Sequence, residues 1–178
     1  MKKEIHFKTK SFKCLSKCNI VFGGLLLVFI LGCSGSTDFA EYKSTSELEF
    51  LFPKGNKGSD KFFTGNAYNY GLVMDTILTT IAGNVYFEPG ARSNWHKHPG
   101  GQILIITDGV GYHQIEGESI QIIKKGDAVT CPPNTRHWHG ASHDVGLQQL
   151  YIVPNIEKGV VDWMEVVTDE QYNQVLNK

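Results

Sequence analysis

The stretch from Phe62 to Val153 is a succession of short segments rich in β-branched and aromatic residues. Turn-forming residues separate them, as in Glu88-Pro89-Gly90 and Pro99-Gly100-Gly101. Segments of this length and spacing are typical of antiparallel strands joined by tight turns. The sequence therefore predicts an all-β fold, either a sandwich or a barrel. We expect strands near residues 72–78, 80–88, 102–107, 109–116, 118–124, 128–131 and 146–153.

The end of the chain departs from this strand pattern. Thr168 is followed three positions later by Gln171, which is the arrangement of a capping box at a helix N-terminus. Tyr172, Val175 and Leu176 then fall on one face of a helix. We therefore expect residues 62–178 to form one domain, a barrel with a short C-terminal helix.

The N-terminus has the layout of an export signal. Six of the 17 Lys and Arg residues precede residue 20, and an apolar run at 19–31 follows them. This run has about the length of a signal-peptide core and is short for a membrane span. It ends at Gly32-Cys33, which resembles a bacterial lipobox, in which the cysteine is lipidated and the chain is cut before it. An uncleaved anchor and an ordinary signal peptide are the alternatives.

The lipobox resemblance implies a lipoprotein signal peptide at residues 1–32. A lipid on Cys33 would then anchor an exported protein to a membrane of the cell envelope. Residues 33–61 are mixed and polar, with Pro53 and Gly55 among their helix breakers. We expect them to form a flexible tether that contains a helical turn at Thr45–Phe52.

Charge argues against one large class of partners. Removal of residues 1–32 leaves 11 of the 17 cations and 17 of the 18 anions, so the formal net charge of the remainder is −6. Proteins that bind nucleic acids need a basic surface. We therefore expect no nucleic-acid partner and a small-molecule substrate instead.

The histidines are the main candidates for a functional site, because six of the seven lie in the second half of the chain. His96 and His98 are two residues apart, so in a strand both point to one face. The Pro99-Gly100-Gly101 turn lets the chain reverse and bring Gln102 toward them, and His137 follows after two intervening hairpin strands. Three imidazoles and an amide oxygen suit one divalent transition metal, and they leave coordination positions free for water or substrate.

The order and spacing of these residues resemble the two motifs of the cupin superfamily. The residues that match the first motif are Gly90, His96, His98 and Gly109. The residues that match the second motif are Gly126, Pro132 and His137. The chain departs from the motifs with Gln102 in place of Glu, Asn134 in place of Gly and Ala141 in place of Asn. The resemblance covers about residues 63–153 and implies a single cupin barrel, that is, a jelly roll or double-stranded β-helix.

The glutamine resembles a subset of cupins with a His-x-His-x3-Gln…His metal site, found alone or fused to carboxymuconolactone-decarboxylase-like domains. Some members are manganese-dependent hydroxynitrile lyases, so the resemblance favours manganese over iron, nickel or zinc. It implies His96, His98, Gln102 and His137 as the metal ligands. Some members carry a pocket histidine where this chain has Gln149, which implies a catalytic position there. Paired cupin barrels often form dimers, so the resemblance also implies a homodimer.

His139 is the second candidate catalytic residue. It alternates in phase with His137 and so points into the same cavity, as an acid or a base. The alternative is a structural histidine whose nitrogens are both hydrogen bonded. For other residues near the motifs, we expect barrel packing for Trp95, Trp138 and Tyr151, a salt bridge for Arg92, burial for Cys131 and solvation for His113 and His143.

Four neutral ligands predict a strong Lewis acid. None of them cancels the +2 charge of the ion, whereas a glutamate would cancel half of it, so a bound hydroxyl or carbonyl is polarised more strongly. We therefore expect a metal-dependent enzyme with lyase, isomerase or oxygenase chemistry on a small oxygenated substrate. The first alternative is similar to the cupins that linearise unsaturated uronates from polysaccharides, which also use three His and one Gln. The second alternative is a non-catalytic module that binds a sugar or a small acid.

Overall fold

The computed structural model describes residues 48–177. Its strands are β1 (Asn56–Lys57), β2 (Phe63–Thr64), β3 (Ala67–Asp75), β4 (Thr80–Phe87), β5 (Arg92–Ser93), β6 (His96–Lys97), β7 (Gln102–Ile115), β8 (Gln121–Lys124), β9 (Ala128–Cys131), β10 (His137–Ala141), β11 (Leu147–Pro154) and β12 (Asp162–Trp163). Its helices are η1 (Ile156–Lys158), α2 (Asp169–Asn173) and η2 (Gln174–Asn177). The predicted signal peptide at residues 1–32 and the predicted lipid site Cys33 lie outside the described residues. None of the helices within 48–177 has the length and hydropathy needed to cross a membrane.

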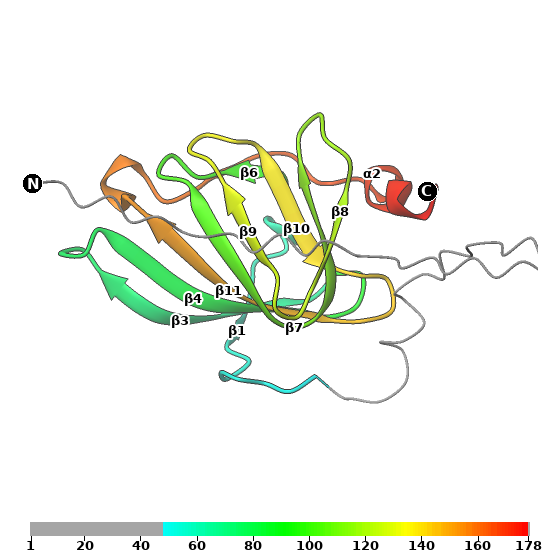
Figure 1. Ribbon diagram of the computed structural model, residues 1–178, viewed down its shortest axis with the longest axis horizontal. Coiled ribbons are helices and arrows are strands. Elements are labelled where there is room, and N and C mark those ends of the chain that lie inside the picture. Colours follow the sequence, from blue (N-terminus) through cyan, green and yellow to red (C-terminus); the bar gives the residue numbers. More distant parts are fainter. Residues whose placement is uncertain (1–47, 178) are drawn as a thin grey trace, which may run out of the picture. The chain divides into compact units, whose positions relative to one another are not determined.

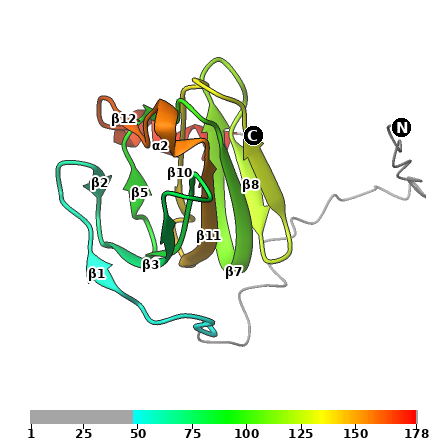
Figure 2. The same cartoon turned by 90° about the vertical axis from the view of Figure 1, so that its left-hand side faces the viewer.

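The strands form one curled sheet with two layers (Figures 1 and 2). Layer A contains β1, β3, β4, β9, β11 and the first part of β7. Layer B contains β2, β5, β6, β8, β10, β12 and the last part of β7. Buried side chains from both layers pack together, among them Val85 and Leu104 from layer A and Ile123 and Ala141 from layer B. The predicted all-β barrel is therefore confirmed.

Strand β7 belongs to both layers. Its residues 103–109 pair with β11 in layer A, and residues 111–115 pair with β10 in layer B. The change occurs at Gly109, which has φ +85° and where a Cβ would lie 2.0 Å from the Gly146 carbonyl oxygen. Only glycine fits this corner, and β7 has an extra residue against β11 just before it. The predicted break between 102–107 and 109–116 is therefore wrong, because the glycine bends one continuous strand.

The first described residues lie against layer A. The predicted helical turn at Thr45–Phe52 is wrong for its described part, since residues 48–52 are not helical. Backbone N–H groups that a helix would use internally donate instead to side chains of the sheet, from Glu49 to Asp108 (2.7 Å) and from Leu51 to Gln148 (3.4 Å). Strand β1 then pairs with β3. Residues 48–61, which are the described part of the expected tether, therefore pack on the barrel.

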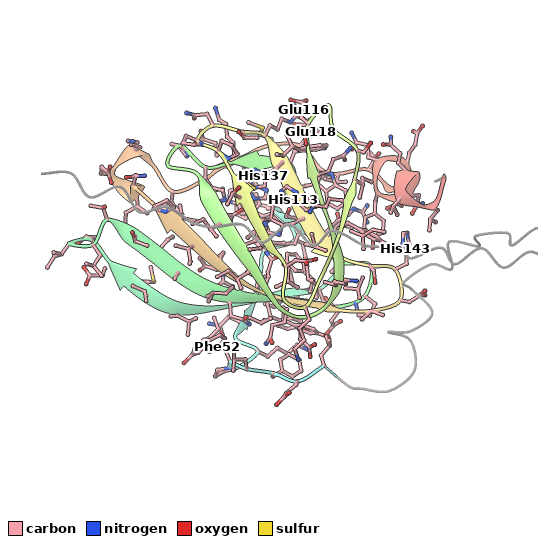
Figure 3. The ribbon with its side chains drawn as sticks, viewed as in Figure 1. Phe52, His113, Glu116, Glu118, His137 and His143 are labelled. Atoms are coloured by element: carbon pink, nitrogen blue, oxygen red, sulfur yellow. The ribbon has the colours of Figure 1, made fainter. Side chains whose placement is uncertain are left out.

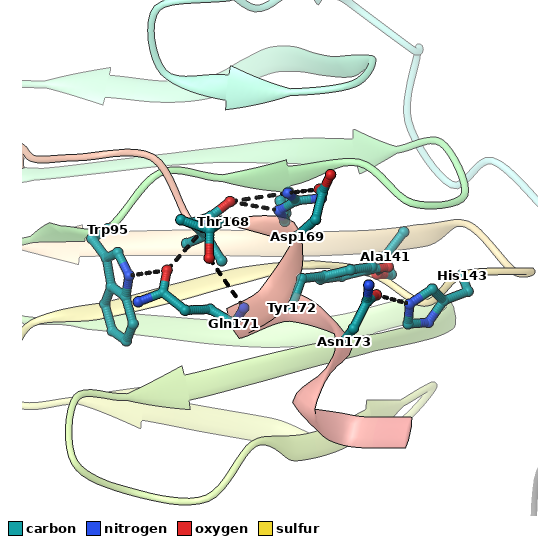
Figure 4. A network of polar contacts seen from close by, with 10 residues as sticks. Trp95, Ala141, His143, Thr168, Asp169, Gln171, Tyr172 and Asn173 are labelled. Atoms are coloured by element: carbon teal, nitrogen blue, oxygen red, sulfur yellow. Dashed lines mark hydrogen bonds and ion pairs between the residues drawn. The ribbon is translucent and has the colours of Figure 1, made fainter. Parts of the chain in front are cut away.

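The C-terminal helix covers the side of layer B where Trp138 lies, opposite to His137 and His139. Thr168 accepts from the Gln171 backbone N–H and donates to its side chain, so the predicted capping box is confirmed (Figure 4). Tyr172 packs on Trp138 and donates its hydroxyl to the Ala141 carbonyl (2.8 Å). The helix therefore packs on the outer face of β10. The prediction that Leu176 shares a face with Tyr172 and Val175 is wrong, because the last turn is the tighter η2 and Leu176 is exposed while the other two are buried.

Candidate metal centre

The four predicted ligands come from three neighbouring strands. His96 lies on β6, His98 follows that strand, Gln102 is the first residue of β7 and His137 is the first residue of β10. β6 and β10 pair so that His96 and His137 are cross-strand neighbours. Because such neighbours have Cβ atoms roughly 5 Å apart, this register brings the two imidazoles together.

The turn between His98 and Gln102 reverses the chain as expected. The N–H of Gly101 donates to the His98 carbonyl (3.0 Å), and Gly101 has φ +86°. A Cβ on Gly100 would lie 2.0 Å from the Pro154 carbonyl oxygen. Both positions therefore require glycine, and the resulting tight turn returns Gln102 to the two histidines.

The structure brings all four predicted ligands together. The ring centroid of His96 lies 4.3 Å from that of His137 and 5.2 Å from that of His98. Gln102 Oε1 lies 3.0 Å from His137 Nε2. Each of the four residues is at most 6% exposed. They form a buried cluster within the barrel, in the region where Figure 3 labels His137.

The Nδ1–H of each predicted histidine ligand donates to a backbone carbonyl. The pairs are His96 with Asn94 (2.9 Å), His98 with Val160 (2.6 Å) and His137 with Thr135 (2.8 Å). Burial lowers the pKa of all three, that of His137 to about 3, so the rings are neutral at pH 7. A carbonyl oxygen only accepts, so the ring proton is on Nδ1 and the lone pair is on Nε2. Metal-binding histidines are held in this way.

Several lone pairs in the cluster have no donor to bind. His98 Nε2 is buried and has no hydrogen-bond partner among the described residues. His137 Nε2 and Gln102 Oε1 face each other, and with the His137 proton on Nδ1 both are acceptors. Two acceptors at this distance repel unless a positive charge lies close to both. A divalent transition metal held by these residues and His96 would supply that charge, so the donor set fits such an ion.

His139 joins this cluster from the same face of β10. One ring nitrogen each of His96, His137 and His139 lie within 4.8 Å of one another, so this trio has the geometry to hold a metal ion, whereas the predicted ligand His98 lies outside it. However, Gln149 Nε2 donates to His139 Nδ1 (2.8 Å), and burial lowers the pKa of His139 far below its usual value. The neutral ring therefore carries its proton on Nε2, which has no partner among the described residues. As a donor, this nitrogen suits a substrate better than an ion.

A cavity of about 140 Å³ lies beside the cluster. His96, His98, Gln102 and His139 line it on one side. Its apolar walls come from Phe63, Ile81, Val85, Val153, Val160 and Trp163. A cavity of about 150 Å³ is large enough to bind benzene. The cavity therefore suits a substrate whose apolar part is about the size of one aromatic ring.

Residues 155–163, which we call the strap, hold two of the predicted ligands in place. Trp163 pairs with His96 across β12 and β6, and their ring centroids are 5.0 Å apart. The Val160 carbonyl accepts from His98. Sequence reasoning did not identify Val160 or Trp163 as parts of the site, because no residue pattern in the strap indicates that it returns to β6.

His113 is the histidine that sequence reasoning placed wrongly, since it is 3% exposed rather than solvated. Its ring centroid is 5.8 Å from that of His137, and its Nε2 is 3.3 Å from Cys131 Sγ. Burial lowers the pKa of His113 to about 4 and raises that of Cys131 to about 12, so both are neutral. Strand alternation could not locate His113, because α2 buries the other face of this strand too, at Tyr112.

The other expectations for residues near the motifs have clear outcomes. Burial is confirmed for Trp95, Trp138 and Cys131. Arg92 forms the expected ion pair, with Asp169, and its guanidinium also donates to the Val167 carbonyl. His143 is half-buried and bonded to Asn173, so it is solvated only in part (Figure 4). Tyr151 is half-buried and lines the cavity.

Known proteins resemble this chain in sequence and in fold. The cupin domain family matches residues 83–153. Over 119 residues the chain is 44% identical to an (R)-mandelonitrile lyase of Granulicella tundricola, which covers 66% of this chain and 91% of that protein. A cupin-like protein from Thermotoga maritima superposes with a TM-score of 0.70 at 46% identity, over 71% of this chain and 96% of its own.

A more distant structure shares the fold alone. It is a cupin 2 conserved barrel domain protein from Rhodopseudomonas palustris, with a TM-score of 0.51 and 21% identity over 69% of this chain and 81% of its own. The two motifs, the curled two-layer sheet and the buried histidine cluster agree with these similarities. The chain therefore belongs to the cupin family.

Proposed function

We propose that this protein is a metal-dependent lyase that cleaves or forms the bond between a hydroxyl-bearing carbon and a nitrile carbon in a small aromatic cyanohydrin. The observation that carries the proposal is the set of three histidines whose Nδ1–H groups are all held by carbonyls, next to a ring-sized apolar cavity. The 44% identity to an (R)-mandelonitrile lyase supports the reaction class.

His96, His98, Gln102 and His137 would hold the ion. A divalent metal there, manganese by resemblance to related cupins, would act as a Lewis acid that lowers the pKa of a substrate hydroxyl. All four donors are neutral, so the protein leaves the charge of the ion undiminished. Burial of the cluster also excludes bulk water, which strengthens every electrostatic contact inside it.

His139 and the apolar walls would position the substrate. The Nε2–H of His139 donates to the charge that develops on the leaving nitrile group, while Gln149 keeps this tautomer in place. In the cleavage direction, the carbon–nitrile bond breaks and its electron pair leaves with cyanide. The hydroxyl proton is released and cyanide takes it up in solution, so the products are an aldehyde and hydrogen cyanide.

The cavity gives less support to the uronate and sugar alternatives. An unsaturated uronate carries a carboxylate and several hydroxyls, which require basic or polar partners. Neither Lys nor Arg is among the described residues that line the cavity, and most of its wall is apolar. Turnover of 4,5-unsaturated uronates, followed as loss of ultraviolet absorbance, would nevertheless establish the uronate alternative.

The test is an assay of the purified protein loaded with manganese, iron, nickel or zinc. We expect release of benzaldehyde from mandelonitrile, followed by its absorbance, with one enantiomer preferred. His98→Ala should lose metal by elemental analysis and activity together, because it removes a donor. His143→Ala serves as the matched control, since that histidine lies outside the cavity. Stoichiometric metal in His98→Ala would contradict the site, and metal without turnover would contradict the reaction.

A further inference from the structure

We infer that Asn69 and Tyr151 form a second recognition point in the cavity, which selects aromatic substrates that carry a hydroxyl on the ring. The inference rests on the proposed lyase function and narrows its substrate class. It starts from the distribution of polar groups along the cavity wall. Among the described residues that line the cavity, these two are the polar side chains that do not belong to the histidine cluster or to Gln102.

The pair lies on the other layer of the barrel. Asn69 is on β3 and Tyr151 is on β11, both in layer A. His96 and His139 are on β6 and β10 in layer B. Since both layers line one cavity, a molecule inside it meets the cluster on one side and this pair on the other. The other lining side chains are apolar.

Gly83 sets the position of the tyrosine. Gly83 and Tyr151 are cross-strand partners, and a Cβ on Gly83 would lie 2.4 Å from the tyrosine hydroxyl oxygen. The phenol ring therefore lies flat across β4 in the space that a side chain would otherwise fill. Its hydroxyl reaches Asn69 on the next strand, where it donates to Oδ1 at 3.4 Å. Any larger residue at position 83 would displace it.

The hydrogen-bonding capacity of this pair is largely unused. At 3.4 Å the bond from Tyr151 to Asn69 is long for an O–H···O contact and therefore weak. The amide nitrogen of Asn69 donates to no other side chain or carbonyl among the described residues, and Asn69 is exposed. A ring hydroxyl both accepts and donates, so it could accept from the Asn69 amide while it donates to the tyrosine oxygen.

The expected discrimination is modest because the pair is partly exposed. Without a ring hydroxyl, water can satisfy Asn69 and Tyr151, so an unsubstituted ring is not rejected outright. One net hydrogen bond between neutral groups is worth roughly a 3- to 10-fold gain in affinity. We therefore expect 3- or 4-hydroxybenzaldehyde to bind roughly 3- to 10-fold more tightly than benzaldehyde.

Direct binding of these three aldehydes to the manganese-loaded protein tests the inference without turnover. Dissociation constants come from the fluorescence of Trp163, whose ring lines the cavity, or from calorimetry. Tyr151→Phe and Asn69→Leu should each bring the affinity ratio of hydroxylated to plain aldehyde close to one. Gly83→Ala should do the same, because its Cβ displaces the tyrosine. Tyr70→Phe is the matched control, as an exposed tyrosine on β3 outside the cavity.

The outcomes separate this inference from the proposed function. A ratio of one in the wild type, an unchanged ratio in all three variants, or no binding of any aldehyde overturns the second recognition point. A ratio that falls in the variants supports it, provided that their metal content equals that of the wild type. Hydroxylated aldehydes that bind more tightly without any cyanohydrin turnover would overturn the lyase function and keep the recognition point.

Discussion

At the scale of single residues, charge is the property that separates this site from a cupin with glutamate in its metal motif. Gln102 takes the position where the superfamily motif has a carboxylate, and its Oε1 lies beside His137 Nε2. An amide oxygen binds an ion less tightly than a carboxylate does, but it leaves more charge to act on the substrate. Affinity and Lewis acidity should therefore change in opposite directions at this residue.

Gln102→Glu should bind manganese more tightly and turn over cyanohydrin at least about tenfold more slowly, which corresponds to about 1.4 kcal/mol in the activation barrier. The carboxylate cancels half of the charge of the ion, so the substrate hydroxyl is polarised less. Metal affinity is measured by competition with a chelator, and turnover by aldehyde release. Gln121→Glu, at an exposed position of β8, is the matched control. Faster turnover in Gln102→Glu would refute this account of the glutamine.

Sequence reasoning reached the central residues because their geometry is local. Strand alternation and a glycine turn are enough to bring His96, His98 and Gln102 together, and pairing with β10 adds His137. It failed for His113, because both faces of β7 are buried there, one by the core and the other by α2. Which face of β7 points to the cavity depends on where α2 packs, and the residue pattern of a single strand does not show this.

At the scale of elements, the strap links the C-terminal part of the chain to the candidate metal site. Its Val160 carbonyl accepts a hydrogen bond from His98, and its Trp163 lies beside His96. Trp163 also stacks on Phe62, with ring centroids 4.7 Å apart. The strap thus orients two ligands while contributing none itself, and such orienting contacts are typically worth 10- to 100-fold in metal affinity, a rough range.

Trp163→Ala should therefore lower manganese affinity by roughly tenfold, although no ligand is changed. The strap would lose its main packing contact, and the Val160 carbonyl would hold His98 less firmly. Chelator competition measures the affinity, and urea unfolding shows whether the barrel stays folded. Trp163→Phe should restore most of the affinity, and Phe50→Ala, which removes an aromatic contact with Tyr86, is the control. Wild-type affinity in Trp163→Ala would mean that the strap does not orient the ligand.

Elements were predicted well where turns delimit them and poorly where tertiary contacts do. The strands at 80–88, 128–131 and 146–153 match β4, β9 and β11 within a residue or so. Gly109 was predicted to lie in a turn, because an isolated glycine in the sequence fits both a hairpin turn and a bulge within one strand. Strands β5, β6 and β12 have two residues each, too few for any periodicity to show.

At the scale of the whole molecule, the buried histidines make stability depend on pH. Burial lowers the pKa of His96, His98, His113, His137 and His139 in the folded protein. In the unfolded chain each has a pKa near 6.5, so acid protonates the unfolded state first. Stability is therefore complete above about pH 6.5 and falls as the pH drops toward 4.

Each of these histidines should lower the free energy of unfolding by up to about 1.4 kcal/mol per pH unit over that window. Urea unfolding of chelator-treated protein between about pH 7.5 and 4.5 measures the slope. His113→Asn should reduce the slope by up to one proton, because that residue is not a proposed ligand. A free energy of unfolding that stays constant or rises as the pH falls would show that the histidines do not control stability.

Membrane attachment is a second expectation for the whole molecule, and it concerns residues outside 48–177. We propose that Cys33 carries the lipid, on the resemblance of residues 1–33 to a lipoprotein signal. Radiolabelled palmitate should be incorporated when the full chain is expressed in a bacterium, and Cys33→Ser should abolish the label. Cys131→Ser is the control, since that thiol is buried in the barrel. Equal labelling of wild type and Cys33→Ser would exclude this site of attachment.

The carbonyls that orient the histidines determine when an ion can bind. They belong to Asn94, Thr135 and Val160, so the complete site draws on residues spread over more than 60 positions. No shorter piece of the chain presents all three carbonyls, so we expect the complete site to form only once the strap pairs with β6. An ion held as we propose would therefore be taken from what is available in the compartment where folding ends, and not where the chain is made.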